Sequence, residues 1–141
     1  MLFEGELKMV KSKKIISLIL IMSSVAIFST SVFAATASFS GILPKYQGDT
    51  EVSVVRRASD NTGYFTIRVD SIQYGTNSVC AWTEGSWGGN YSNPYNQAGI
   101  GDKRNISYST PPAKGENVIL NLDNPVNVDY TVEVSGIWSP N

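Results

Sequence analysis

The central segment of the chain reads Tyr64-Phe65-Thr66-Ile67-Arg68-Val69-Asp70, with apolar and polar side chains in strict alternation. A period of two places the apolar set on one face of a β-strand and the polar set on the other. The same period recurs at 118–122 and at 128–135, where valine and leucine dominate the apolar set. These three segments therefore predict strands that each turn one face towards a core.

The rest of the chain after residue 34 also reads as short strands separated by turn-forming residues. Clusters of Gly, Asn, Asp and Pro punctuate it, and no segment carries apolar residues at helical spacing over three turns. We expect strands at 37–43, 51–57, 63–72, 78–83, 104–109, 117–122 and 128–138. About seven strands at intervals of roughly ten residues predict an all-β fold, a single antiparallel β-sandwich.

The N-terminal segment has the pattern of an export signal. Three lysines between residues 11 and 14 precede an almost uncharged apolar run at 15–28, and small residues follow at 32–37. The alternative is a retained membrane anchor, but the apolar run is short of the about 20 residues that a bilayer span needs. We expect residues 1–34 to be a cleaved signal peptide, so that the protein is secreted and meets the membrane only during export.

The exact ends of the signal peptide follow from local sequence. Cleavage after Ala34 is expected, with cleavage after Ala37 as the alternative, and it leaves a mature β-domain of residues 35–141. Two glutamates within residues 1–8 are unusual ahead of a basic n-region. We therefore expect Met9 to be the true start and residues 1–8 to be an over-called extension.

Composition excludes several classes of function. The chain of 141 residues has 11 Lys and Arg, 12 Asp and Glu, no histidine and one cysteine. Without histidine, no Ser-His-Asp or Cys-His nucleophile can form, and one thiol excludes a CxxC pair, an intramolecular disulfide and a Cys-type zinc site. A net charge of −1 argues against nucleic-acid binding. The carboxylates lack both the dense alternation of a calcium loop and the paired setting of a glycosidase. We expect no enzyme, catalytic residue, metal or cofactor.

The segment 84–103 is longer than a usual hairpin connection and is rich in glycine, asparagine and aromatic residues. Two interpretations stay open. Trp87, Tyr91 and Tyr95 are candidate ligand-binding residues if their rings form an exposed platform that stacks on sugars beside Asn and Gln amides. Alternatively, the segment is an Ω-like loop or a long hairpin whose aromatic side chains fold over the core. In that case we expect Trp87 to be the core lid.

Five other residues carry predictions. Cys80 is predicted to be a buried and inert thiol, and Trp138 is predicted to close the core from the inward face of the last strand. The adjacent pair Arg56-Arg57, with Arg68, is interpreted either as a site for an anionic cell-wall polymer or as protection of a strand edge.

The two ends of the β-domain carry a family resemblance. The segment from Phe39 to Gly48 and the segment from Tyr130 to Asn141 resemble a group of small exported Gram-positive proteins classed as a domain of unknown function. Those proteins close on a Ser-Gly-aromatic-Trp segment, and this chain has Ile137 at the aromatic position. The resemblance implies a secreted β-domain without an assigned activity, and it suggests an association with bacteriocins.

Three classes of function stay open at this point. The first is a non-catalytic extracellular or cell-surface interaction protein, with a surface protein as its partner. The second is a carbohydrate-binding module for cell-wall polysaccharide that uses the aromatic segment 84–103. The third is a bacteriocin-like secreted antimicrobial protein. Exposure and alignment of Trp87, Tyr91 and Tyr95 separate the second class from the others.

Overall fold

The computed structural model describes residues 35–73 and 76–141. The predicted signal peptide and the expected start at Met9 therefore lie outside the described residues. The described residues form eight β-strands and no helix, and so none of them belongs to a helix that could cross a membrane. The strands are β1 (Ala37–Leu43), β2 (Thr50–Arg56), β3 (Tyr64–Ile72), β4 (Ser78–Gly85), β5 (Tyr95–Gly99), β6 (Lys103–Ser107), β7 (Asn117–Asp123) and β8 (Val132–Ser139).

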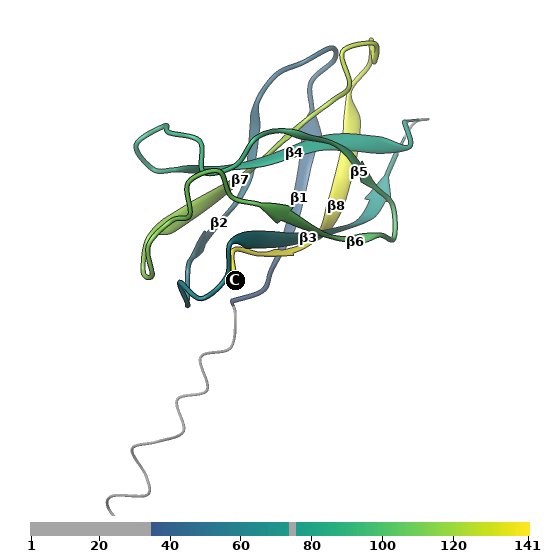
Figure 1. The fold of residues 1–141 in the computed structure, drawn as a ribbon. Helices are drawn as coiled ribbons and strands as arrows, with labels where there is room; N and C mark the ends of the chain where they lie inside the picture. The colour runs from purple at the N-terminus through teal and green to yellow at the C-terminus, as the bar shows by residue number, and fades with distance from the viewer. Residues whose placement is uncertain (1–34, 74–75) are drawn as a thin grey trace, which may run out of the picture. The chain divides into compact units, whose positions relative to one another are not determined.

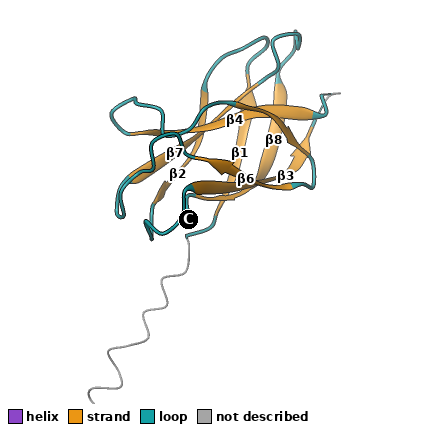
Figure 2. Cartoon of the chain, viewed as in Figure 1, coloured by secondary structure: helices purple, strands orange, loops and turns teal. Residues whose placement is uncertain are grey.

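The strands form two four-stranded antiparallel sheets that pack in a sandwich-like arrangement (Figure 1). Sheet A has the order β1-β8-β3-β6, and sheet B has the order β2-β7-β4-β5. Within the described chain, β4 and β5 are the only consecutive strands that are also neighbours in one sheet, because every other connection passes between the sheets (Figure 2). The all-β prediction is confirmed, and the two-sheet arrangement agrees with the predicted sandwich.

The strand predictions differ from the structure in two places. β5 lies inside the segment that the sequence predicts to be a loop, which raises the number of described strands to eight. The last strand begins at Val132 instead of residue 128, because Val128 closes a turn through its N–H to the Pro125 oxygen. The Val128 oxygen in turn accepts a hydrogen bond from the N–H of Tyr46. Residues 128–131 therefore tie two connections together instead of extending the sheet.

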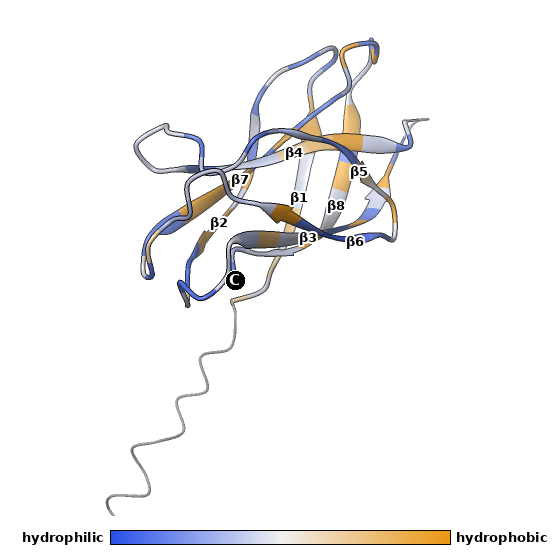
Figure 3. Cartoon of the chain, in the orientation of Figure 1, coloured by the Kyte–Doolittle hydropathy of each residue, from blue (hydrophilic) through white to orange (hydrophobic). Residues whose placement is uncertain are grey.

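The core lies between the two sheets and follows the predicted alternation on β3. Phe65, Ile67 and Val69 are buried, and apolar residues concentrate on the strands while most connections are polar (Figure 3). On β7 the alternation fails as an indicator of exposure, because Ile119 and Asn121 on its outer face are buried as well. The middle of the outer face of sheet B is therefore covered by other parts of the domain at Ile119 and Asn121.

Trp138 closes the core, as predicted. Its side chain is 1 % exposed and packs within the main apolar cluster. Two residues earlier, Gly136 leaves no room for a side chain. A Cβ atom there would overlap the main-chain oxygen of Arg68 and approach the Phe39 ring to 2.7 Å. The small residue lets β8 pass close to its neighbours and lets Phe39 fill the space.

Arg57 is buried inside the domain and does not face solvent. It is 1 % exposed, and its guanidinium donates to the main-chain oxygens of Thr62, Pro112 and Asn141. The Tyr108 ring lies 5.2 Å from the guanidinium carbon. The interpretation of Arg57 as part of an anion site is therefore wrong. Its charge is enclosed by carbonyl groups from three separate segments, which it holds together.

Candidate functional site

The segment after β4 is a β-hairpin, not an irregular loop. The N–H groups of Gly85 and Gly88 donate to the oxygens of Gly89 and Gly85 at 2.9 Å each, and Glu84 bridges to Asn90. Gly88 has a φ of 83°, a left-handed conformation that favours glycine. The hairpin is one of the two alternatives that the sequence left open.

Trp87 is exposed and lies against its own hairpin. Its side chain is 71 % exposed, and the ring covers Gly85 and Gly89 so closely that a Cβ atom at either position would collide with it. The edge of Trp87 meets Tyr91, with 5.9 Å between centroids and 82° between planes. The expectation that Trp87 is the core lid is wrong, because Tyr91 occupies that place.

The other two aromatic residues turn inwards. Tyr91 is 4 % exposed, and its hydroxyl donates to Oε2 of Glu116 at 3.0 Å. Tyr95 is half-buried and packs against the core, opposite Ala81. The structure therefore brings Trp87 and Tyr91 into contact but does not align the three rings into one exposed platform.

A hollow of about 640 Å³ lies over the outer face of sheet B. Polar side chains dominate its lining, and one tryptophan, Trp82, contributes from the central strand β4. The lining residues are Gln47, Gly48, Asp49, Cys80, Trp82, Glu84, Gly88, Asn90, Pro94, Asn96 and Asp123. None of the three candidate aromatic residues belongs to this set, so the sequence analysis missed the hollow.

Strand alternation on β4 produces the floor of the hollow. Val79, Ala81 and Thr83 are fully buried on the core side, which directs Cys80, Trp82 and Glu84 to the outer face. The run from Val79 to Trp82 is continuously apolar, a pattern typical of a strand that is covered on both faces. This run and the apolar run Val118-Ile119-Leu120 on β7 are local signals of a covered outer face.

The walls of the hollow come from distant segments. Asp123 of β7 pairs in register with Cys80, and its Oδ1 accepts a hydrogen bond from the N–H of Gly48 at 2.8 Å. That bond holds the β1–β2 connection, with Gln47 and Asp49, beside the sheet. On the opposite side, Asn96 projects from an irregularity in the pairing of β4 with β5.

The charge of the hollow is negative. Among its described lining residues are the carboxylates of Asp49, Glu84 and Asp123, and no Lys or Arg. Burial, together with the smaller effects of the Asp123 and Asp49 charges, raises the pKa of Cys80 from 9.0 to about 11. The thiol therefore stays protonated at neutral pH. Within the described part of the chain, no three His, Cys, Asp or Glu side chains gather closely enough to hold a metal ion.

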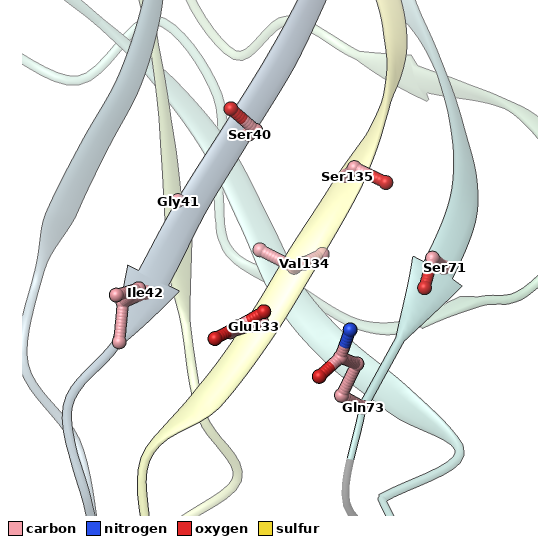
Figure 4. Close-up of a pocket in the computed structure, with 8 residues that line it drawn as sticks. All are labelled: Ser40, Gly41, Ile42, Ser71, Gln73, Glu133, Val134 and Ser135. Atoms are coloured by element: carbon pink, nitrogen blue, oxygen red, sulfur yellow. The ribbon is translucent and has the colours of Figure 1, made fainter.

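Among the smaller depressions of the described surface is one of about 280 Å³, whose lining includes Arg68, Lys103 and Trp138. Two more differ in their relation to the hollow. One, of about 210 Å³, shares Gln47, Cys80 and Asn96 with the hollow and extends it towards the connection after β7. The other, of about 370 Å³, lies on the outer face of sheet A (Figure 4). Serine side chains of β1, β3 and β8 dominate this depression on sheet A, together with Glu133 and Gln73. Its described lining contains no aromatic residue. The hollow on sheet B offers the richer set of chemical groups.

Comparison of the chain with protein-family models, with curated proteins and with solved structures finds no match. The resemblance of the segments near Phe39 and Trp138 to a family of exported proteins therefore stays a prediction.

Proposed function

We propose that this chain is a secreted, non-catalytic binding protein and that the hollow on sheet B binds a saccharide. The observation that carries the proposal is the hollow itself, about 640 Å³ in volume and lined by amides, carboxylates and Trp82. A volume of a few hundred cubic ångströms is typical of small-ligand sites. The secreted state rests on the export signal predicted at residues 1–34.

The lining chemistry suits a hydroxyl-rich ligand. The amides of Asn90 and Asn96 each offer a donor and an acceptor, and the nearby carboxylates offer acceptors. A sugar hydroxyl is both a donor and an acceptor, so it can use both kinds of group. Trp82 is only 6 % exposed and adds a small apolar area to the floor. Recognition therefore depends on hydrogen bonds more than on stacking.

A non-catalytic role is supported by the state of the hollow's reactive groups. Cys80 is a protonated thiol without a histidine base. Asp123 is buried and already accepts the Gly48 N–H. A glycosidase needs one carboxylate held protonated in apolar surroundings and a second one across the scissile bond. Glu84 and Asn90 instead form part of a polar rim that is open to solvent.

Two neighbouring amides on β5 provide a matched test. Asn96 lines the hollow, whereas Gln97 is equally exposed and does not line it. We expect the purified protein to bind oligosaccharides in a panel, and Asn96→Ala to weaken that binding by about two- to tenfold through loss of one or two hydrogen bonds. Gln97→Ala should leave binding unchanged, and the oligosaccharide should be recovered intact.

Three outcomes would contradict the proposal. Failure of every oligosaccharide to bind would exclude a saccharide as the ligand. An equal loss of affinity in Asn96→Ala and Gln97→Ala would exclude the hollow as the binding site. Release of shortened sugar from a bound chain would contradict the non-catalytic role.

A further inference from the structure

The hollow on sheet B continues into a second depression and so forms an extended groove. The two share Gln47, Cys80 and Asn96, and the second one adds residues 124–127 of the connection after β7. The far end of the hollow reaches Gly88 in the hairpin. The groove therefore crosses the sheet from one connection to another. An extended groove of this kind fits several linked units of a chain better than one isolated ring.

The charge of the groove restricts which chain can enter. Asp49, Glu84 and Asp123 bring three carboxylates to it, and neither depression has a Lys or Arg among its described lining residues. A polyanion, such as a phosphate-linked wall polymer, would meet only like charge here. A ligand with positive charge gains at each carboxylate instead.

A second feature of the groove also points to a ligand. Asn124 lines the second depression and is buried. Its Nδ2 donates to the main-chain oxygens of Pro44 and Tyr130, whereas its Oδ1 has no hydrogen-bond partner among the described residues. A buried acceptor left unpaired is unfavourable in the free protein, and a donor from a ligand would relieve it.

We propose that this groove binds a linear glycan that carries free amino groups, that is, a chain of deacetylated amino sugars whose ammonium groups face Asp49, Glu84 and Asp123. This inference rests on the saccharide site proposed above and specifies its ligand. A basic peptide has similar charge, but the site fits it less well. Peptides usually add to a strand edge or fill apolar pockets, whereas this groove lies over a sheet face and is lined by polar amides.

The experiment compares oligomers of glucosamine with N-acetylglucosamine oligomers of equal length, from one to six units, by titration calorimetry at low salt. We expect the glucosamine hexamer to bind about tenfold more tightly than its acetylated counterpart, because each exposed ion pair adds about a 1.5- to fivefold gain. Affinity should rise from monomer to hexamer. Added salt should remove most of the difference between the two series.

Charge-neutral variants test whether the preference for glucosamine oligomers arises from the carboxylates of the groove. Asp49→Asn and Glu84→Gln should each weaken glucosamine binding by about 1.5- to fivefold. They should weaken binding of the acetylated series by a smaller factor, because the amide loses the charge but retains an acceptor oxygen for a sugar hydroxyl. Glu51→Gln is the matched control, since Glu51 is an exposed carboxylate on β2 that lines neither depression. An unchanged urea midpoint in each variant shows that the fold is intact.

The outcomes separate this inference from the proposed function. Equal affinity for both series, with Asn96→Ala still weakening both, would overturn the charge requirement and leave the saccharide site standing. Binding of hexalysine as tightly as the glucosamine hexamer would overturn the glycan in favour of a peptide. If no oligosaccharide of either series binds, the proposed function fails and this inference fails with it.

Discussion

Replacing Arg57 by methionine should be among the most destabilising single changes in the domain. Methionine keeps much of the length and apolar volume of the side chain but removes the charge and every donor. The main-chain oxygens of Thr62, Pro112 and Asn141 then lose the guanidinium donor, and the Asn141 oxygen keeps only a long hydrogen bond from the Thr62 hydroxyl. The segments that carry these oxygens are far apart in sequence, and Arg57 is the donor that they share.

The magnitude follows from the burial of each lost contact. The hydrogen bond to Pro112 is buried, so its orphaned oxygen costs about 1–3 kcal/mol. The bonds to Thr62 and Asn141 are partly buried, and their oxygens can recover water at a cost of about 1 kcal/mol each. Loss of the Tyr108 contact adds about 0.5–1 kcal/mol. These contributions add up to about 3.5–6 kcal/mol. Because the Asn141 oxygen keeps the Thr62 hydroxyl as a donor, the expected loss is about 4 kcal/mol, a large part of the roughly 5–15 kcal/mol typical of a domain.

Equilibrium unfolding in urea, followed by tryptophan fluorescence, measures this loss. With a slope of roughly 2 kcal/mol per molar, the midpoint of Arg57→Met should fall by about 2 M. Arg56→Met is the matched control, because Arg56 is exposed and donates to the Gly115 oxygen at the surface. Its midpoint should change by less than about 0.5 M. Equal midpoints for the two variants would refute the reasoning from burial.

Two further substitutions and two measurements on Cys80 test other parts of the fold. Trp138→Ala should lower the free energy of unfolding by about 3–5 kcal/mol in a urea titration, and an unchanged midpoint would show that the ring does not close the core. Gly136→Ala should destabilise the domain because its Cβ would overlap the Arg68 oxygen; full stability would mean that β8 can shift freely. Cys80 should react slowly with a thiol reagent at neutral pH and faster towards pH 11, and rapid labelling at pH 7 would contradict its burial. Between pH 9.0 and about 11 the unfolded state releases the Cys80 proton while the folded state retains it, so stability should fall across that window.

The parts of the fold that depend on local pattern were predictable from the sequence. Phe65, Ile67 and Val69 alternate with polar residues, and the structure places them in the core. β5 was missed because Asn96 and Gln97 form an irregular step in the pairing, which breaks the alternation that identifies a strand. The burial of Asn121 was not predictable, since it depends on its proximity to Trp82 across the sheet.

The candidate site was less predictable than the fold. Its residues come from four separated segments around Asp49, Trp82, Asn96 and Asp123, and only the paired sheet brings them together. The sequence instead drew attention to Trp87 and its neighbours, where composition was unusual. Aromatic content alone could not show that the Trp87 ring would pack against Gly85 and Gly89 of the same hairpin.

The most direct measurement is a map of ligand-induced amide shifts by ¹⁵N NMR, recorded with the tightest-binding oligosaccharide. Binding at the hollow predicts shifts in Trp82, Asn90 and Asn96, with the depression on sheet A near Ser40 and Ser135 unaffected. Shifts confined to that depression on sheet A, or to Trp87, would contradict the assignment of the site to the outer face of sheet B.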